Sequence, residues 1–363
     1  PKFGVMWGLA EWLQLRGSYA ESFRAPSLAE LDPFRNRNTL LPAVVNGAPA
    51  TVLGTFGSTA HLEPEVAITR TLGFDLEAPG DSRLRLRATY FDIDYGGRIA
   101  EPDPTQGVQA QAAPHRFPGI FFTTDSADLI GNLLASTRNL INFSGVDLTA
   151  PDASAQLAAL PNFYIFDNRL RNLSDVSLAG FDVDIAYGAD TQWGDISFGA
   201  RATYMSDYEE QLSPDAPVTT IVDTALRPVD LRARGFIGLE RDGFEATLAA
   251  NFVDSYRNPY SRGETRIDSW TTWDARLAFD LWRAGMGEGS EVSIGAKNIF
   301  DEPPPYVETS GPQGAALRAP IGFDPANANP LGRTIWIEFV KRWWGVRRPG
   351  HPLWGCARHT RGP

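Results

Sequence analysis

Strict alternation of apolar and polar side chains recurs along most of this chain. In residues 195–204, Ile196 and Phe198 fall on one side of an extended backbone, and Ser197 and Arg201 fall on the other. A period of two predicts a β-strand, because successive side chains point to opposite faces of a sheet. The same alternation occurs in residues 83–90, 244–252 and 273–281.

Strands rather than long helices are predicted throughout. The chain has 34 glycines and 27 prolines, which interrupt it too often for long helices. We therefore predict an all-β fold of about eleven strands. These are residues 1–9, 13–23, 65–78, 83–95, 173–190, 194–208, 228–241, 244–256, 267–283, 291–299 and 332–343.

The connections between these strands alternate between short and long. An antiparallel up-and-down transmembrane β-barrel has short turns on one side of the membrane and long loops on the other. A soluble β-sandwich, the alternative fold, has no reason to keep every long loop at one end. The short connections are 10–12, 79–82, 191–194, 241–243 and 284–290, and the long loops are about 24–64, 96–172, 209–227, 257–266 and 300–331.

Two further features favour the barrel. Arg83, Arg85 and Arg87 occupy one whole face of a strand, as a water-filled interior permits. Aromatic residues stand near strand ends, where the two interfacial girdles of a membrane barrel lie. These are Trp7, Trp12, Tyr19, Tyr90, Tyr187, Trp193, Tyr204 and Trp282.

Eleven is an odd number of strands. The first and last strands of such a meander run in the same direction, so they cannot pair antiparallel to close a barrel. An open sheet would leave unpaired backbone groups in lipid. We therefore expect residues 1–343 to be part of a larger barrel.

Composition narrows the possible functions. The net charge of −11 argues against a nucleic-acid partner. One cysteine, Cys356, cannot form an internal disulfide or a cysteine-based metal site, and the four histidines lie far apart. No stretch of about 18 apolar residues exists for a helical membrane span. No metal, cofactor or nucleophile–base pair is apparent, so no enzymatic activity is expected.

The longest loop, 96–172, contains two helical patterns and many aromatic residues. Residues 127–135 and 153–160 have apolar side chains at helical spacing. One interpretation is a self-packed loop with a small core of its own. The other is an aromatic surface that grips a ligand.

Six short phrases, in order, resemble phrases of the TonB-dependent outer-membrane receptors. They extend from about residue 16 to residue 343, and one such phrase alone would be weak. They are FRAPSLAEL (23–31), LEPE (62–65), YFDIDY with RI (90–99), N with GFDVD (172–184), KNIFDEPP (297–304) and GFDP with GR (322–333).

The resemblance implies a fold and a function. The family barrel has 22 strands around an N-terminal plug, which agrees with plugged 22-stranded transporters. This chain would be its C-terminal half, in the bacterial outer membrane, taking up a bulky, scarce nutrient. Implied partners are the plug and the other barrel half, the TonB complex acting through the plug, the barrel-assembly machinery reading the last strand, and lipid. A passive porin-like channel and a soluble glycan-binding module remain alternatives.

Nine residues carry the family phrases most directly. Arg24 is expected to anchor the base of its loop to a carboxylate, and a plain strand terminator is the competing interpretation. Residues 344–363 follow the expected end of the last strand and are predicted to be a disordered tail. The motif residues are Phe23, Arg24, Pro26, Asn298, Phe300, Asp301, Gly332, Arg333 and Trp343.

The transported ligand cannot be identified from the sequence. Siderophores, corrinoids and oligosaccharides all fit the resemblance, and mixtures of aromatic residues and arginine suit sugars and anionic chelates alike. The candidate ligand-binding residues in the long loops are Arg35, Arg37, Arg116, Phe121, Phe122, Tyr164, Phe166, Tyr208, Tyr256, Tyr260, Arg262 and Tyr306.

Overall fold

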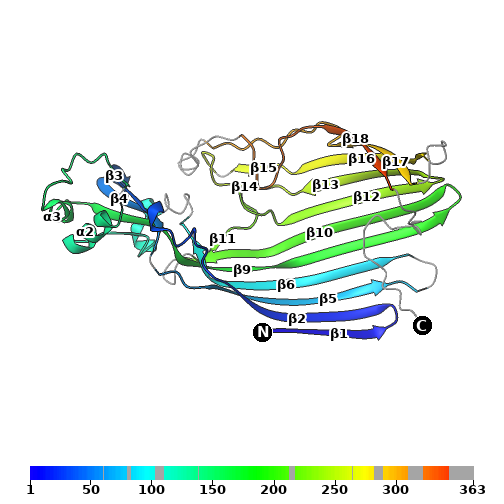
Figure 1. The fold of residues 1–363 in the computed structure, drawn as a ribbon, viewed down its shortest axis with the longest axis horizontal. Coiled ribbons are helices and arrows are strands. Elements are labelled where there is room, and N and C mark those ends of the chain that lie inside the picture. Colours follow the sequence, from blue (N-terminus) through cyan, green and yellow to red (C-terminus); the bar gives the residue numbers. More distant parts are fainter. Residues whose placement is uncertain are drawn as a thin grey trace.

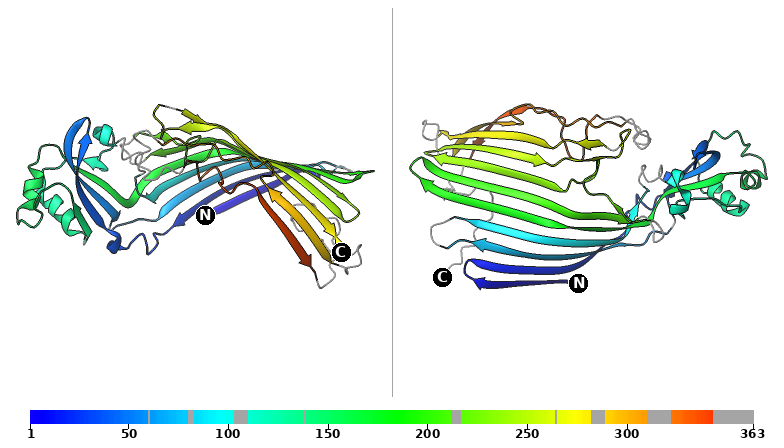
Figure 2. Two further views of the ribbon diagram at one scale, coloured as in Figure 1. Left: turned by 90° about the horizontal axis from the view of Figure 1, so that it is seen from above. Right: turned by 180° about the vertical axis from the view of Figure 1, so that it is seen from behind.

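A long antiparallel meander dominates the computed structural model, which describes residues 1–59, 61–79, 83–102, 110–137, 139–211, 217–263, 265–281, 289–309 and 322–342. Its strands follow one another in chain order across a twisted, curved sheet (Figures 1 and 2). They are β1 (Lys2–Ala10), β2 (Leu13–Arg24), β5 (Glu65–Glu77), β6 (Arg85–Ala100), β9 (Phe163–Thr191), β10 (Gly194–Gln211), β12 (Leu231–Arg241), β13 (Phe244–Val253), β16 (Trp270–Asp280), β17 (Ser290–Lys297) and β18 (Thr334–Lys341).

The order and direction of these strands confirm the predicted up-and-down fold. Every neighbouring pair from β1 to β18 is antiparallel, so β1 and β18 run in the same direction. Within the described residues, these two strands pair on one side only and the barrel is not closed. Short turns gather at one end of the sheet, the short-turn end, and long connections at the other, the long-loop end (Figure 1).

Toward the short-turn end, one face of the meander is apolar and uncovered. Ile185 of β9, Ile237 of β12 and Ile337 of β18 are 41%, 45% and 73% exposed. Neither a second sheet nor a helix packs on this face in the described part of the chain (Figure 2). A soluble sandwich would bury these side chains between two sheets, so the exposure favours a face that meets lipid.

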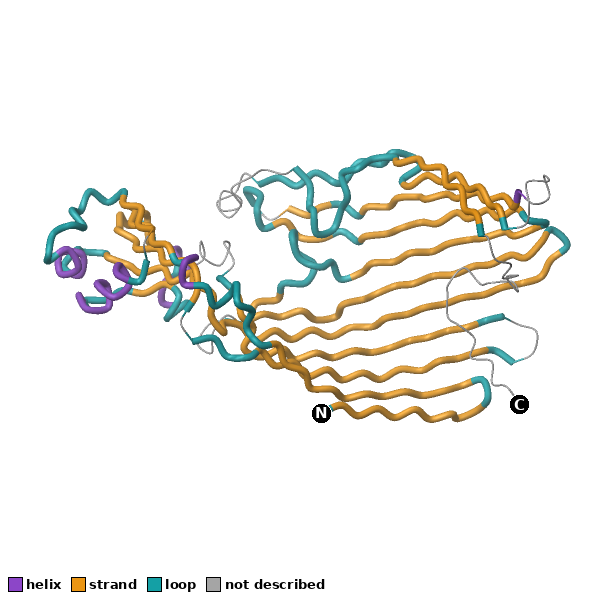
Figure 3. Tube along the Cα trace, viewed as in Figure 1, coloured by secondary structure: helices purple, strands orange, loops and turns teal. Residues whose placement is uncertain are grey.

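Part of the longest loops forms a small domain of its own, here called the outer module (residues 36–59 and 110–171). Its sheet has the strand order β8–β3–β4–β9–β7, so β9 belongs to both sheets. Figure 3 shows the module at the long-loop end, with its helices beside its strands. The bounds are β3 (Arg37–Val45), β4 (Ala48–Ser58), β7 (Phe121–Phe122), β8 (Asn139–Asn142), α2 (Ala127–Ala135) and α3 (Ala153–Ala158).

Two hydrophobic clusters hold the outer module together. Leu40 and Leu53 pack with Ile130 of α2 and Leu157 of α3, and all four side chains are fully buried. A second cluster surrounds Phe121. The interpretation of a self-packed loop is therefore confirmed, as is the helix at 127–135, while the second helix ends two residues earlier than predicted. No described helix is long and apolar enough to cross a membrane.

The predicted loop 24–64 is partly wrong, because it contains the β3–β4 hairpin. Its turn residues, Asn46 and Gly47, have φ angles of 48° and 77°. An Asn-Gly pair between apolar runs is a strong hairpin signal, since both residues tolerate positive φ. The sequence itself carries this signal at Asn46-Gly47.

Other strand boundaries also differ from the prediction. The strand expected at 228–241 begins at Leu231, and β9 begins ten residues before the expected 173. Trp282, Trp343 and the proposed tail 344–363 lie outside the described residues. Short elements complete the fold: the 3₁₀ turns η1 (Pro33–Arg35) and η2 (Pro114–Arg116), and the strands β11 (Thr219–Thr220), β14 (Tyr256–Asn258) and β15 (Thr265–Ile267).

Placing a charge on the uncovered face should prevent stable insertion. We expect Ala200→Arg to destabilise the folded protein in lipid bilayers by about 2–4 kcal/mol, because the charge would sit in hydrocarbon. The matched control is Thr203→Arg on the same strand, whose side chain faces the other way and would meet Asp182, the present hydrogen-bond partner of Thr203 at 2.6 Å. Folding equilibria in vesicles measure both, and equal effects would contradict the assignment of the faces.

Candidate functional site

The second face of the meander is lined by arginines that pair with carboxylates on neighbouring strands. Arg16 of β2 and Arg87 of β6 both contact Asp75 of β5, at 3.3 and 3.6 Å. Such half-exposed pairs contribute little stability each, but together they make a hydrated and largely self-neutralised wall. Further pairs are Arg201–Asp184, Arg234–Asp274 (2.9 Å), Arg276–Glu245 (3.3 Å) and Arg276–Glu291 (2.8 Å).

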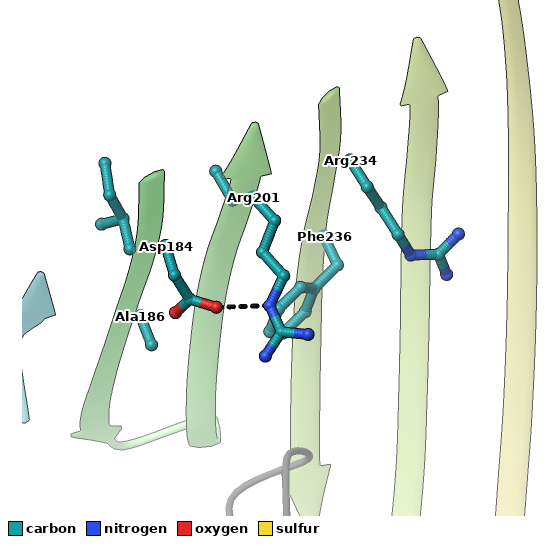
Figure 4. A pocket seen from close by; sticks show the side chains of 7 residues that line it. Asp184, Ala186, Arg201, Arg234 and Phe236 are labelled. Carbon is teal, nitrogen blue, oxygen red and sulfur yellow. Dashed lines mark hydrogen bonds and ion pairs between the residues drawn. The ribbon is translucent and has the colours of Figure 1, made fainter. Parts of the chain in front are cut away.

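A small pocket in this wall shows how tightly it is packed. Arg201 reaches back to Asp184, and Phe236 lies beside it (Figure 4). A Cβ added to Gly199 would collide with the ring of Phe236, so the ring fills the place that glycine leaves open. The pocket holds only about 10 Å³, so a bulky ligand has no site here.

Arg24 forms an anchor at the long-loop end, as predicted. Its guanidinium donates two hydrogen bonds to the carboxylate of Glu30, both 3.0 Å long, and two to the carboxylate of Glu65. Glu65 is 2% exposed and also accepts hydrogen bonds from the Tyr95 hydroxyl and the Ile99 backbone N–H. We call this network, Arg24 with Glu30, Glu65, Tyr95 and Ile99, the Arg24 anchor.

The anchor explains the local fold of the FRAPSLAEL phrase. The Ser27 backbone N–H donates to the Glu30 carboxylate at 2.7 Å, so the chain after Pro26 turns back on Arg24. The hydrogen bonds from Arg24 lower the pKa of Glu30 below its ordinary value. The FRAPSLAEL and LEPE phrases therefore meet at Arg24, which binds Glu30 of the first and Glu65 of the second.

Asn172 joins the LEPE phrase to the phrase at 90–99 at the same end of the sheet. Its amide nitrogen donates to the carbonyls of Glu63 (2.8 Å) and Gly97 (2.7 Å), and its oxygen accepts from the Glu63 N–H at 2.7 Å. Three chain segments far apart in sequence are thus tied by one side chain.

The KNIFDEPP and GR phrases are joined to each other by hydrogen bonds. Asn298, with a φ of 49°, exchanges hydrogen bonds with the Glu302 backbone at 2.8 and 2.9 Å. Asp301 accepts the Arg333 backbone N–H at 2.6 Å. A Cβ at Gly332 would lie 2.7 Å from the Asp301 carboxylate, so this position favours glycine. Phe23 and Phe300 are exposed, and their role as motif residues stays a prediction.

Asp324 ties its own connection, residues 322–333, to the connections 217–230 and 254–269, through Leu226 and Tyr256. The sequence did not identify it as a site residue. Its carboxylate is fully buried and accepts hydrogen bonds from Leu226 N–H (2.9 Å), Ala326 N–H (2.8 Å) and the Asn327 amide (2.8 Å). The Asn327 amide also donates to the Arg227 carbonyl at 2.8 Å. We call this arrangement the Asp324 hub. The sequence showed Asp324 only as part of a phrase.

A hydrophobic cluster packs beside the Asp324 hub. Tyr256 and Tyr260 are buried there with Ala225, Ile267 and Val307. Burial, with a further contribution from the Asp324 carboxylate, raises the pKa of Tyr256. The connections 217–230, 254–269 and 300–309 are therefore cross-linked rather than independent.

Most of the predicted ligand-binding residues lie in the outer module or in the loops around the Asp324 hub, whereas Arg35 lies in η1 and Tyr208 in β10. Phe121, Tyr256 and Tyr260 lie in hydrophobic cores, so we assign them to packing and omit them from the proposed contacts. The structure brings Phe121 together with Tyr164 and Phe166, at ring-centroid distances of 5.3 and 5.9 Å. Exposed or half-buried are Arg35, Arg37, Arg116, Phe122, Tyr164, Phe166, Tyr208, Arg262 and Tyr306.

Removing the Arg24 side chain should destabilise the protein. Arg24→Ala leaves the buried Glu65 carboxylate without its cation, which should lower the free energy of unfolding by about 1–3 kcal/mol. The control is Arg35→Ala in the same loop, because Arg35 is exposed and makes one 3.3 Å hydrogen bond to Ala29. Denaturant unfolding measures both, and an Arg24→Ala effect no larger than the control would favour a plain strand terminator.

The Asp324 hub predicts a specific pattern of hydrogen exchange. Asp324→Ala should speed amide exchange in residues 224–232 and 256–267 together, because both segments lose their shared support. Asp268→Ala, which removes an exposed loop carboxylate, is the matched control. Exchange measured by mass spectrometry tests this, and a change confined to residues near 324 would refute the shared hub.

Comparisons with known proteins agree with this architecture. The family model described as TonB dependent receptor-like, beta-barrel matches residues 1–299. The siderophore receptor PirA from Acinetobacter baumannii is similar with a TM-score of 0.57 and 13% identity, over 94% of this chain and 40% of that one. The ferric enterobactin receptor PfeA from Pseudomonas aeruginosa gives a TM-score of 0.55 and 14% identity over the same shares of the two chains. No curated protein matches the sequence.

These likenesses differ in what they establish. At 13% and 14% identity the solved structures show the fold alone, and the chain spans 40% of their length. The family model covers most of the chain, including the Arg24 anchor and Asn298. The chain belongs to the TonB dependent receptor-like β-barrel family, whose members are transport receptors of the bacterial outer membrane.

Proposed function

We propose that this chain is the C-terminal part of the barrel of an active-transport receptor, energised through TonB, for a bulky and scarce nutrient. One observation carries the proposal: a curved sheet with an uncovered apolar face, an ion-paired polar face and its long connections at one end. Such a wall separates lipid from a hydrated lumen without any chemistry on the ligand.

In the described residues, β1 and β18 run in the same direction and each pairs with a neighbouring strand on one side only. This supports the proposal that further strands complete the barrel. A complement that pairs antiparallel with both must have an odd number of strands, as the other half of a 22-strand barrel would. A plug inside it would contact the TonB complex, and the barrel-assembly machinery would recognise β18. Residues 1–343 form the barrel part in this proposal.

A ferric siderophore is the first ligand class to test, and corrinoids and oligosaccharides are the others. The similar structures named above are a siderophore receptor and a ferric enterobactin receptor. The exposed members of the candidate set support this choice, because arginine and tyrosine side chains suit an anionic, aromatic chelate. Among them are Arg116 and Tyr306, the latter 75% exposed.

Uptake by cells that carry the whole receptor tests the proposal. We expect uptake of a radiolabelled ferric siderophore to require both the receptor and TonB. Tyr306→Ala combined with Arg116→Gln should weaken binding about tenfold, since two lost contacts remove roughly 1.4 kcal/mol.

Trp193→Ala is the control, because Trp193 is exposed at the opposite, short-turn end. Uptake of a corrinoid or an oligosaccharide instead would change the ligand class. Uptake that continues without TonB would overturn active transport and favour a passive channel.

A further inference from the structure

The connection 217–230 contains a strained turn at residues 223–228. The Asp223 backbone N–H donates to the Pro228 carbonyl at 3.0 Å, which closes the turn. Asp223 and Leu226 have φ angles of 56° and 65°, in the left-handed region that side chains other than glycine adopt infrequently. Such a conformation persists only where the surrounding structure enforces it. The turn therefore depends on contacts from other parts of the chain.

Arg257 of the connection 254–269 supplies several of these contacts. Its backbone N–H donates to the Asp223 carbonyl at 3.0 Å, and its carbonyl accepts the Ala225 N–H at 2.9 Å. Its guanidinium donates to the Thr224 hydroxyl at 3.3 Å. We call this contact between the turn 223–228 and Arg257 the seam.

The Asp223 side chain at the seam is poorly satisfied. It is 21% exposed, and its Oδ1 is buried without a hydrogen-bond donor in the described residues. The other oxygen, Oδ2, lies 3.7 Å from Nη2 of Arg266, which is too far for a hydrogen bond. That nitrogen donates instead to the carbonyl and hydroxyl of Ser255, at 2.8 and 2.9 Å. A buried carboxylate oxygen without a donor carries a desolvation cost, which is largest when the group is ionised.

The charged groups around Asp223 add to this cost on balance. Burial raises the pKa of the Asp223 carboxyl above its ordinary value, and the Asp230 carboxylate raises it further. Arg266 and Arg257 lower this pKa, and Asp254 raises it. Oδ1 of Asp230 is itself buried without a donor in the part of the chain that the structure describes. The seam therefore holds more carboxylate charge than its two arginines offset.

We propose that Asp223 is a pH-sensitive latch: its protonated carboxyl holds the turn 223–228 against Arg257, and its ionisation loosens this seam. A neutral carboxyl costs less to bury than a carboxylate and has an O–H of its own to donate. The raised pKa means that the closed seam binds this proton more tightly than the open seam does. Closure is therefore favoured at low pH, and the advantage is lost as the pH rises through the raised pKa.

The latch gives the long-loop end a response to the pH of the surrounding medium. The connections 217–230 and 254–269 are also joined at the Asp324 hub, so the seam is a second tie between them, and one that titrates. This inference goes beyond transport and does not depend on the identity of the ligand.

Hydrogen exchange of the whole receptor, measured by mass spectrometry between about pH 4 and about pH 8, tests the latch. Rates are corrected for the intrinsic effect of pH on exchange. Protection of residues 224–228 and 256–258 should fall as the pH rises, about tenfold for each unit by which the pKa of the closed form exceeds that of the open form. Helix α2 of the outer module is the internal reference and should show no such fall.

Two variants identify the group that titrates. Asp223→Asn should keep both segments protected at every pH, because the amide is neutral and asparagine accepts a positive φ. Asp268→Asn is the matched control and should retain the response of the unchanged protein, because Asp268 is exposed in the same connection. Protection that does not change with pH in the unchanged protein would overturn the latch. So would an Asp223→Asn variant that still loses protection as the pH rises, or an equal fall in α2.

Discussion

Backbone pairing is the constraint on which the rest of the structure depends. Each N–H and C=O group that meets hydrocarbon must find a partner within the protein, and the meander supplies these partners through its antiparallel ladders. Toward the short-turn end, side chains are then free to divide, with aliphatic and aromatic groups on the uncovered face and paired arginines and carboxylates on the other. This division makes the same sheet suitable both for lipid and for a water-filled interior.

At the long-loop end, the ladders give way to side-chain ties that order the loops. The Arg24 anchor, Asn172 and the Asp324 hub each join segments distant in sequence through buried or half-buried hydrogen bonds. A buried carboxylate such as Glu65 or Asp324 is stable only when its oxygens are satisfied, so each also enforces the geometry around it. These ties therefore order the described parts of the loops relative to one another.

The outer module adds a second body at this end. It has its own hydrophobic clusters, and among the described strands only β9 belongs to both the module and the meander. Its aromatic residues are largely used for packing, so contacts with a ligand would have to come from the exposed arginines and the half-buried Phe122, Tyr164 and Phe166.

The sequence by itself determined the eleven strands of the meander, their order and their faces, because a period of two and the alternation of short and long connections are local properties. Its phrases also pointed to Arg24. Only the tertiary structure decided which carboxylates Arg24 meets, that Asp324 supports three connections, and that Phe121, Tyr256 and Tyr260 are core residues. Apart from the Arg24–Glu30 pair, these facts depend on contacts between residues far apart in the chain, such as Arg24–Glu65, Asn172–Gly97 and Leu226–Asp324, which are 41, 75 and 98 residues apart. No periodicity along one strand encodes them.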